Sequence, residues 1–554
     1  MHLQIQKSED GSQKSEVRSQ RSRVRISAFC FLFSVLLIAG GCSKSPDHQP
    51  STINHQPSAP TPLAPDSVLR VHWVGKQTLG TAASAYSFMR LWNLPETKQV
   101  EAQLLGKLCN APWQRAANEP PAANNASAAL QPLLDDILNE ETCLEVRESN
   151  GAQQLVLAVR VNNTSATRWM VNLADVLSSL EGTFPTKRGP GWFLNSARTK
   201  TAYELERAGA WIVVGAAKGT NGLFQEIVAR IGREQSPFTV TATNHWLAAD
   251  VDLRWLGTTA NIQHSTFNAQ LPKGRMSLVV SGDGANTVTT GELVFPEPLQ
   301  MNLAPWKFPK AQVQGPVVEF GAIRGLGPWL PDQVFTWADA RTPLQMHFAA
   351  VDGRANEFAK LAEAFLPKGN AWLANHGLGT LAKTPGTSGI IWKDLPMIAP
   401  HLTATSDSLL TGGLVPNPEP GTNAPVDIYP RPTLDELLAT LASKTNLVAY
   451  QWETTGARAE SMHFLGQILR VSTRHPQMPA GTASSVWLQN VRQRLGNCTT
   501  LVTLTAPNRL AFERTSTTGF NAVELHLIAD WMESPLFPRG SYTGLSPIGP
   551  ASAK

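Results

Sequence analysis

Closely spaced carboxylates are the first residues of this chain whose types could do chemistry. Asp250 and Asp252 alternate on an expected strand, so both side chains point to one face. Paired acids of this kind can transfer protons or hold a cation. No third acid and no glycine-rich calcium loop accompanies them, so a solvated sheet face explains the pair better. Asp135-Asp136 and Glu140-Glu141 are interpreted in the same way, as the exposed side of a helix.

The sequence motifs of common enzymes are absent. There is no His-Glu-x-x-His, Cys-x-x-Cys, Gly-x-Ser-x-Gly or Walker loop. No two histidines of the body lie four residues apart, the spacing at which one helix face could bind a metal. These histidines include His245, His264, His347, His376, His401, His463, His475 and His526. The sequence therefore predicts no catalytic residue, no metal ligand and no cofactor.

A glycine-rich segment, residues 215–222, lies between an expected strand and an expected helix. Backbone amides and a helix N-terminus at such a place can hold an anion. The spacing of its glycines and of Lys218 fits no known phosphate cradle, however. A strand-to-helix turn with an N-cap explains the same residues and is the preferred interpretation.

Sixteen tryptophans is a high count for this chain length. Exposed tryptophans in a groove can stack on sugar rings, whereas tryptophans within apolar strands belong to the core. Five of them lie near expected turns and form a candidate binding surface: Trp306, Trp329, Trp337, Trp372 and Trp392.

Three cysteines of the body allow two interpretations. Cys109 and Cys143 could form a disulfide that closes a loop of about 34 residues and contributes about 3 to 4 kcal/mol. They could equally be two small buried hydrophobic residues. Cys498 has no evident mate and no base beside it, so we expect it to be buried and unreactive.

Cys42 is different because of what precedes it. It ends the run Ile38-Ala39-Gly40-Gly41-Cys42, after a basic leader and an apolar stretch of about 16 residues, where a spanning helix needs about 20. This arrangement resembles the lipobox of bacterial lipoproteins, although Ala39 stands where leucine is most usual. The resemblance implies that residues 1–41 are removed and that acylated Cys42 holds the chain to the bilayer in the bacterial cell envelope, facing the periplasm or the exterior.

The balance of basic and acidic residues indicates which class of partner the chain can bind. The leader holds six of the 47 basic and three of the 43 acidic residues, so the rest of the chain is close to neutral. Nucleic acid is therefore not an expected partner, because phosphate binding needs a concentrated positive surface.

The body repeats two short structural units. A strand, a polar turn and an amphipathic helix follow one another at residues 155–180, 344–365 and 447–469. A hairpin precedes a helix at residues 201–231 and 500–531, and the unequal spacings indicate a degenerate duplication. We predict an α+β fold of repeated strand–turn–helix and hairpin–helix units, with mostly antiparallel sheets covered by helices on one face and a central β-rich segment.

Proline-rich stretches and shifts in composition divide the chain. The expected parts are a signal peptide (1–41), a lipid-anchored Pro-rich tether (42–66), a first α+β module (67–235), a β-rich segment (236–310), a second α+β module (311–410), a Pro-rich linker (411–432), a third α+β module (433–535) and a loose tail (536–554).

In layout the chain resembles uncharacterised bacterial lipoproteins with repeated strand–helix modules, which implies no activity. We therefore predict a membrane-anchored envelope lipoprotein that binds or scaffolds another macromolecule and is not an enzyme. The expected partners are the bilayer, through acylated Cys42, and an envelope protein or a glycan. Two alternatives stay open. One is a hydrolase of cell-wall or polymeric substrate, and the other is a carrier of an apolar ligand.

Overall fold

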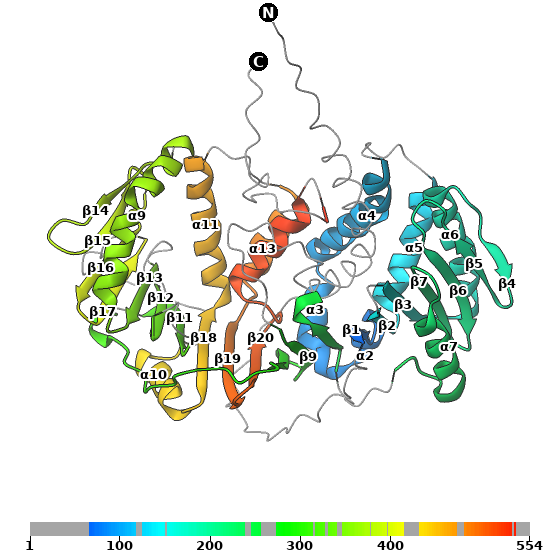
Figure 1. Ribbon diagram of the computed structural model, residues 1–554, viewed down its shortest axis with the longest axis horizontal. Coiled ribbons are helices and arrows are strands. Elements are labelled where there is room, and N and C mark those ends of the chain that lie inside the picture. The colour runs from blue at the N-terminus through cyan, green and yellow to red at the C-terminus, as the bar shows by residue number, and fades with distance from the viewer. Residues whose placement is uncertain are drawn as a thin grey trace, which may run out of the picture. The chain divides into compact units, whose positions relative to one another are not determined.

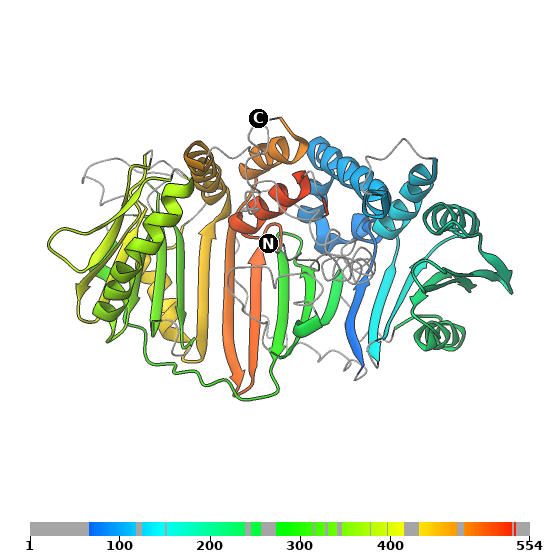
Figure 2. The ribbon, with the colours of Figure 1, turned by 45° about the horizontal axis from the view of Figure 1, so that its top comes forward.

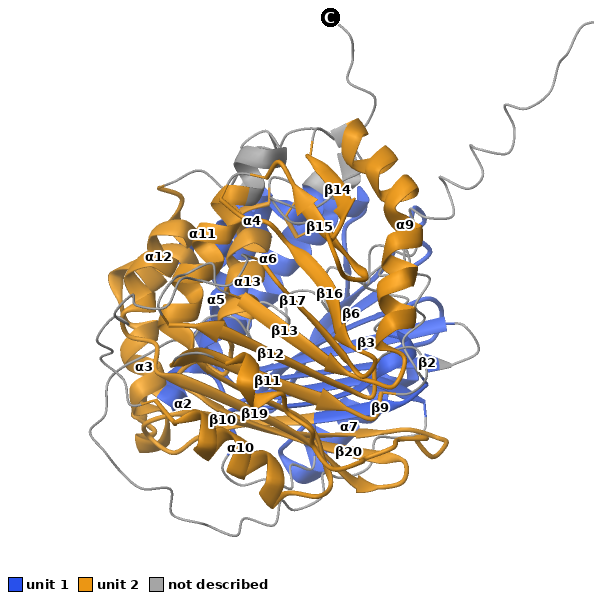
Figure 3. Ribbon diagram, turned by 90° about the vertical axis from the view of Figure 1, so that its left-hand side faces the viewer, with its two compact units in different colours: residues 1–39, 54–79, 102–277 blue, residues 40–53, 80–101, 278–554 orange. Residues whose placement is uncertain are grey.

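The computed structural model describes residues 66–117, 125–149, 152–238, 245–255, 273–313, 316–326, 331–340, 346–376, 378–395, 397–414, 431–473, 481–534 and 537–538. The expected signal peptide and nearly all of the tether, with Cys42, lie outside these residues, as do Trp329, most of the Pro-rich linker and the expected tail from residue 539. The described chain forms two compact units (Figure 3). Unit 1 contains residues 66–79 and 102–277, and unit 2 contains residues 80–101 and those from 278 on.

Unit 1 is built on a sheet of eight strands whose pairings are all antiparallel. Their order is β4–β5–β6–β7–β3–β2–β1–β8. The strands are β1 (Ser67–Trp73), β2 (Thr142–Ser149), β3 (Ala152–Arg160), β4 (Thr186–Arg188), β5 (Gly191–Asn195), β6 (Ala202–Ala208), β7 (Trp211–Ala217) and β8 (Leu247–Asp252). The helices are α5 (Asn125–Asn139), α6 (Asn163–Glu181) and α7 (Gly222–Glu234), while α2 (Lys76–Thr81) and α4 (Pro95–Ala117) have residues in both units.

Helices cover both faces of this sheet. On one face α7 packs against β2, β3 and β7, with Phe224 beside Val156 and Val213. Leu157 and Val214, one residue further along their strands, point to the opposite face and are equally buried. The helices α5 and α6 lie on that face (Figure 2). The prediction that helices cover one face is therefore wrong for unit 1, and the unbroken apolar run of residues 155–159 is typical of a strand buried on both sides.

Unit 2 is built on twelve strands in the order β14–β15–β16–β17–β13–β12–β11–β18–β19–β20–β10–β9, again with antiparallel pairings. They are β9 (Arg275–Gly282), β10 (Thr287–Val294), β11 (Val317–Arg324), β12 (Gln333–Asp339), β13 (Met346–Val351), β14 (Thr380–Lys383), β15 (Gly389–Lys393), β16 (His401–Ser406), β17 (Leu409–Gly413), β18 (Leu447–Thr454), β19 (Asn497–Ala506) and β20 (Arg509–Ser516). The first three residues of β9 belong to unit 1. The helices are α3 (Tyr86–Trp92), α9 (Ala355–His376), α10 (Leu434–Ser443), α11 (Thr455–Thr473), α12 (Ala483–Arg492) and α13 (Ala522–Glu533).

Two apolar clusters lie on opposite faces of this second sheet. Leu437 and Leu441 of α10 pack against Phe320, Phe335 and Trp452 on one face. Small residues of α9, including Ala355 and Ala359, pack against Ala350, Ala404 and Leu410 on the other. The α+β class, the antiparallel sheets and the repeated strand–helix units of the prediction are thus confirmed.

Eight strands of unit 2 repeat the plan of unit 1. The order β14–β15–β16–β17–β13–β12–β11–β18 matches β4–β5–β6–β7–β3–β2–β1–β8 position by position. In chain order, α6 and α9 occupy the same place, after the third strand of each copy, and α7 and α10 both precede the last strand. This shared plan makes α6 the natural comparison for α9 (Figure 1).

Candidate functional site

The structure places the predicted tryptophans in two different environments of unit 2. Trp306 and Trp337 lie in the apolar cluster under α10, where the ring of Trp306 packs against Phe335 at a tilted angle, with ring centroids 5.8 Å apart. Trp372 is half-exposed on α9. Trp392, on β15, donates its indole N–H to the Leu378 carbonyl oxygen at 2.6 Å. A surface shared by all five residues stays a prediction, since Trp329 is not described.

Large apolar side chains are exposed along one side of α9. Leu361 is 65% exposed, Phe365 56% and Trp372 49%. Their spacing of four and seven residues projects them within about 40° of one another along about 16 Å of helix. We call these three residues the α9 stripe.

A groove lies in unit 1 between α6 and the β4–β5 hairpin. Its volume is about 570 Å³, and its walls include Met170, Asp175, Phe184, Lys187 and Trp192. Phe184 is 81% exposed at its edge. An apolar ligand would meet the charges of Asp175 and Lys187 here, so the groove suits an amphipathic molecule better than a purely apolar one.

Three cysteines are buried free thiols in this structure. Burial and the nearby charge of Asp135 raise the pKa of Cys109 to about 11. Burial raises the pKa of Cys143 well above its usual value, and burial and Glu453 raise that of Cys498 to about 12. Such thiols stay protonated at neutral pH and are poor nucleophiles.

A buried hydrogen-bonded chain in unit 1 joins Glu141, His72 and His245. The Nε2 atom of His72 lies 3.0 Å from Glu141, and its Nδ1 lies 2.6 Å from Nε2 of His245. Because the carboxylate accepts from Nε2, a neutral His72 has only Nδ1 left as acceptor, so His245 donates to it. Burial raises the pKa of Glu141, but hydrogen bonds from His72 and Arg160 outweigh burial and hold that pKa below its usual value. Both imidazoles are buried, and neither lines the groove.

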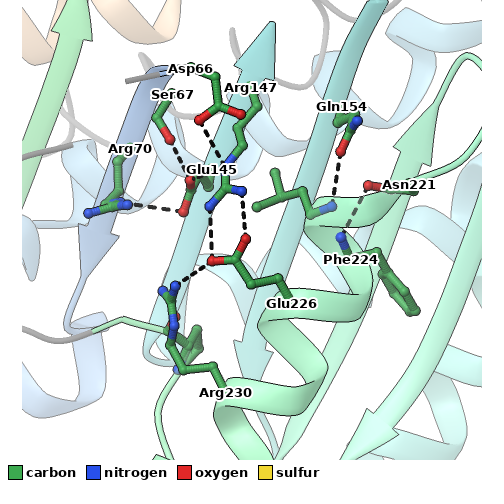
Figure 4. A network of polar contacts seen from close by, with 12 residues as sticks. Asp66, Ser67, Arg70, Glu145, Arg147, Gln154, Asn221, Phe224, Glu226 and Arg230 are labelled. Carbon is green, nitrogen blue, oxygen red and sulfur yellow. Dashed lines mark hydrogen bonds and ion pairs between the residues drawn. The ribbon is translucent and has the colours of Figure 1, made fainter. Parts of the chain in front are cut away.

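A second network in unit 1 surrounds the buried carboxylate of Glu145 (Figure 4). Glu145 accepts from Ser67 at 2.5 Å and from Arg147 at 2.9 Å, and its other oxygen is 3.4 Å from Nε of Arg70. Arg147 also binds Glu226 of α7, at 2.6 and 3.1 Å. These hydrogen bonds hold the pKa of Glu226 below its usual value. The network attaches α7 to β2, so its charges stabilise the fold and are not available to a substrate.

The carboxylate pairs singled out in the sequence have structural partners. Asp250 lies opposite Arg70 on the neighbouring strand, and burial raises its pKa. Asp252 accepts from the backbone N–H of Arg254 at 2.9 Å. The interpretation of Asp136 as exposed is wrong: it is buried and accepts from Arg168 and from the indole of Trp169. Glu141 likewise belongs to the histidine chain.

The glycine-rich segment before α7 is a capped turn. Asn221 accepts from the Phe224 amide at 3.1 Å, and Gln154 accepts from the Leu223 amide at 2.9 Å. Two of the free amides at the start of α7 are therefore occupied by the protein itself, as the N-cap interpretation expected. Gly215 is required because a Cβ there would lie 2.7 Å from Asn221 Nδ2.

Unit 2 contains a buried pair of glutamates that the sequence did not predict. Glu319 and Glu453 face each other across β11 and β18, and Arg458 forms an ion pair with Glu319. Glu453 accepts from the Ala522 amide at the start of α13 at 2.7 Å, and its second carboxylate oxygen has no hydrogen-bond partner. Burial and the charge of Glu319 raise the pKa of Glu453 to about 7.

The sequence could not show these clusters because their members lie far apart in it. His72 and His245 are 173 residues apart, and Glu319 and Glu453 are brought together only by strand pairing. Polar residues inside otherwise apolar strands were the one available signal. Among the described residues, no group of three or more His, Cys, Asp or Glu side chains could hold a metal ion.

The fold is thus an antiparallel α+β fold with an internal duplication. No protein-family model matches the chain, and no curated protein matches it. A solved structure, crystal form III of the treponemal protein TP0453, is similar over 44% of this chain and 79% of its own, with 10% sequence identity and a TM-score of 0.24. A similarity at this level carries no argument about function. In the part of the chain that the structure describes, no helix is long and apolar enough to cross a bilayer.

Proposed function

We propose that this chain is a lipid-anchored protein of the bacterial cell envelope that binds another component and catalyses no reaction. The observation that carries the binding role is the exposed α9 stripe. Leu361, Phe365 and Trp372 are large apolar side chains that unit 2 leaves in contact with water. Contiguous exposed apolar residues of this kind are typical of interaction sites.

The groups that could do chemistry support the same proposal. The thiols of Cys109 and Cys143 are protonated at neutral pH. The acids of both buried clusters already have partners within the protein: Glu141 bonds to His72, Glu319 pairs with Arg458, and Glu453 accepts from the Ala522 amide. The groove of unit 1 has a single acid in its walls, Asp175, and no histidine. A hydrolase that uses two acids, or an acid and a histidine, finds no such pair there.

The anchor is tested by the order of processing. Globomycin blocks the signal peptidase of lipoproteins, so treated cells should accumulate a precursor that still carries residues 1–41. Mass spectrometry of untreated protein should find the N-terminal peptide beginning at acylated Cys42. An unmodified Cys42 with the leader attached would refute the anchoring.

The binding role is tested by complementation of a strain that lacks the gene, with sensitivity to detergent as the readout. We expect the double variant Leu361→Ser, Phe365→Ser to fail, because it removes two of the three side chains of the stripe without touching a buried group. Cys498→Ser should complement, because its thiol is not a nucleophile. If the double variant complemented the strain and Cys498→Ser did not, an enzyme would be favoured over a binding protein.

A further inference from the structure

The outward side of α9 exposes three large apolar side chains, more than any other helix that the structure describes. Besides the α9 stripe it exposes Ala364, Pro367, Ala371 and Ala374, and one uncharged polar residue, Asn375. Its cations are Lys360 and Lys368, and its one acid is Glu357 in the first turn. An exposed face that is apolar and carries lysines is the signature of a helix that lies in a membrane interface.

The matched helix of unit 1 shows that the fold does not require this face. In its first four turns α6 exposes Asn163, Thr164, Thr167, Val171 and Asp175, of which only Val171 is apolar. Both helices follow the third strand of the same eight-strand plan. The apolar face of α9 is therefore a property of this copy and not of the architecture.

We propose that the α9 stripe, with Lys360 and Lys368, rests on the surface of an anionic lipid bilayer. The proposal rests on the proposed anchoring, since acylated Cys42 would keep the body near a bilayer. A second, weak contact then acts at high effective concentration. Figure 1 shows α9 lying across strands β14–β17 of unit 2.

Charge supports this partner. Glu357 and Glu363 each lie three residues from Lys360 along the helix. Glu363 is already paired with Lys383 at 2.7 Å, and that hydrogen bond, with smaller contributions that include the charge of Lys360, holds its pKa below the usual value. Neither Lys360 nor Lys368 forms an ion pair with any residue that the structure describes. Each can therefore approach an anionic headgroup without giving up a direct ion pair within the protein.

Size argues against a protein partner on this face alone. A stable protein interface buries about 800 Å² on each side. Three large side chains and four small ones along about 20 Å of one helix fall well short of that area. A bilayer needs no such area, because the contact adds to an anchor that already holds the chain.

The test places an environment-sensitive fluorophore on the stripe of the full chain. The native thiols of the described body are buried, so a cysteine introduced by Phe365→Cys can be labelled selectively with NBD. Val171→Cys on α6, 55% exposed, is the matched control. Both proteins are reconstituted into vesicles of phosphatidylcholine, with or without phosphatidylglycerol, and into vesicles whose lipids carry a nitroxide on the acyl chain.

The proposal expects a blue shift and a several-fold rise of NBD emission at position 365, stronger with phosphatidylglycerol and quenched by the nitroxide lipids. Position 171 should not change. Adding Lys360→Gln or Lys368→Gln should weaken the docking equilibrium about fivefold for each lysine.

Other outcomes overturn the proposal. A shift that nitroxide lipids do not quench and that grows with the protein-to-lipid ratio would show that a second copy covers the face. An unshifted signal in protein that floats with the vesicles would refute the contact and leave the anchor intact. If Cys42 proves unmodified, the label is placed in protein that also carries Cys42→Ser, and a quenched shift at position 365 would then refute the anchor and leave the contact intact.

Discussion

At the scale of single residues, the buried acids of unit 2 are the groups most sensitive to pH. Glu319 and Glu453 face each other on neighbouring strands, and Arg458 forms its ion pair with Glu319, so a negative charge on Glu453 has no ion-pair partner among the described residues. Like charges opposite one another on neighbouring strands repel, and a low dielectric strengthens the repulsion. Burial first, and this repulsion second, favour the neutral form of Glu453 and raise its pKa to about 7.

Glu453 should make the stability of unit 2 depend on pH. Its folded pKa, about 7, lies above the ordinary value of 4.5, so the folded state binds the proton more tightly than the unfolded chain. The free energy of unfolding is therefore highest below about pH 4.5 and falls as the pH rises through 7, by on the order of 3 kcal/mol. Thermal unfolding of Glu453→Gln between pH 4.5 and 8 should lose this decline. The control variant Asp435→Asn, which changes an exposed acid of α10, should keep the decline. Parallel stability profiles for wild type and Glu453→Gln would show that Glu453 does not cause it.

The histidine chain of unit 1 should show energetic coupling. Removing His245 leaves Nδ1 of His72 buried without its donor, so His245→Ala should lower the free energy of unfolding by about 1 to 3 kcal/mol. In a double-mutant cycle with His72→Ala, the two losses should not add, because each removes the same hydrogen bond. Chemical denaturation measures all four proteins. His401→Ala is the control, because the half-buried ring of His401 makes one long hydrogen bond, 3.4 Å from a carbonyl oxygen. Strictly additive losses for His72→Ala and His245→Ala would contradict a hydrogen bond between the two histidines.

At the scale of elements, two nearby glycines of the β4–β5 hairpin have different roles. A Cβ on Gly191 would lie 1.8 Å from the carbonyl oxygen of Leu205 on β6, whereas a Cβ on Gly189 meets nothing within 4 Å. Gly189 has φ +56°, so alanine there costs about 1 kcal/mol of backbone strain.

We expect Gly191→Ala to destabilise unit 1 by more than about 3 kcal/mol, because β5 must move away from β6. Gly189→Ala should cost about 1 kcal/mol. Hydrogen exchange of the β5 and β6 amides reports the difference directly. Similar protection in the two variants would show that the hairpin is not held as closely as the structure has it.

Sequence periodicity predicted the elements that carry a regular apolar pattern. The helical stripe from Leu173 to Leu180 became α6, and the hairpin flanking Ala208-Gly209 became β6 and β7. Periodicity could not give the order of strands in each sheet, because that order depends on contacts between distant residues. For the same reason the tryptophans near turns did not show which would be exposed: Trp337 is buried by Phe308 and its neighbours, while Trp372 is not.

At the scale of the whole molecule, the duplication distinguishes features that both eight-strand copies share from features that one copy alone has. The two copies share eight strands in one order, and each places one helix after the third strand. Where the copies differ, the architecture does not dictate the residue. The apolar side chains of the α9 stripe are such a difference, because Val171 is the single large apolar side chain that α6 exposes in its first four turns.

The fold should therefore tolerate a polar α9 stripe. Leu361→Thr with Phe365→Gln changes two exposed side chains, each expected to alter the free energy of unfolding by no more than about 0.5 kcal/mol. Leu373→Thr, on the buried side of the same helix, removes a side chain that is 3% exposed and should cost at least about 2 kcal/mol. Thermal unfolding ranks the variants, and vesicle docking of the NBD-labelled protein, with the label placed at Trp372→Cys, measures the loss of the contact. A double surface variant as unstable as Leu373→Thr would mean that something in the folded protein already covers the stripe, since exposed side chains cannot account for a loss of that size.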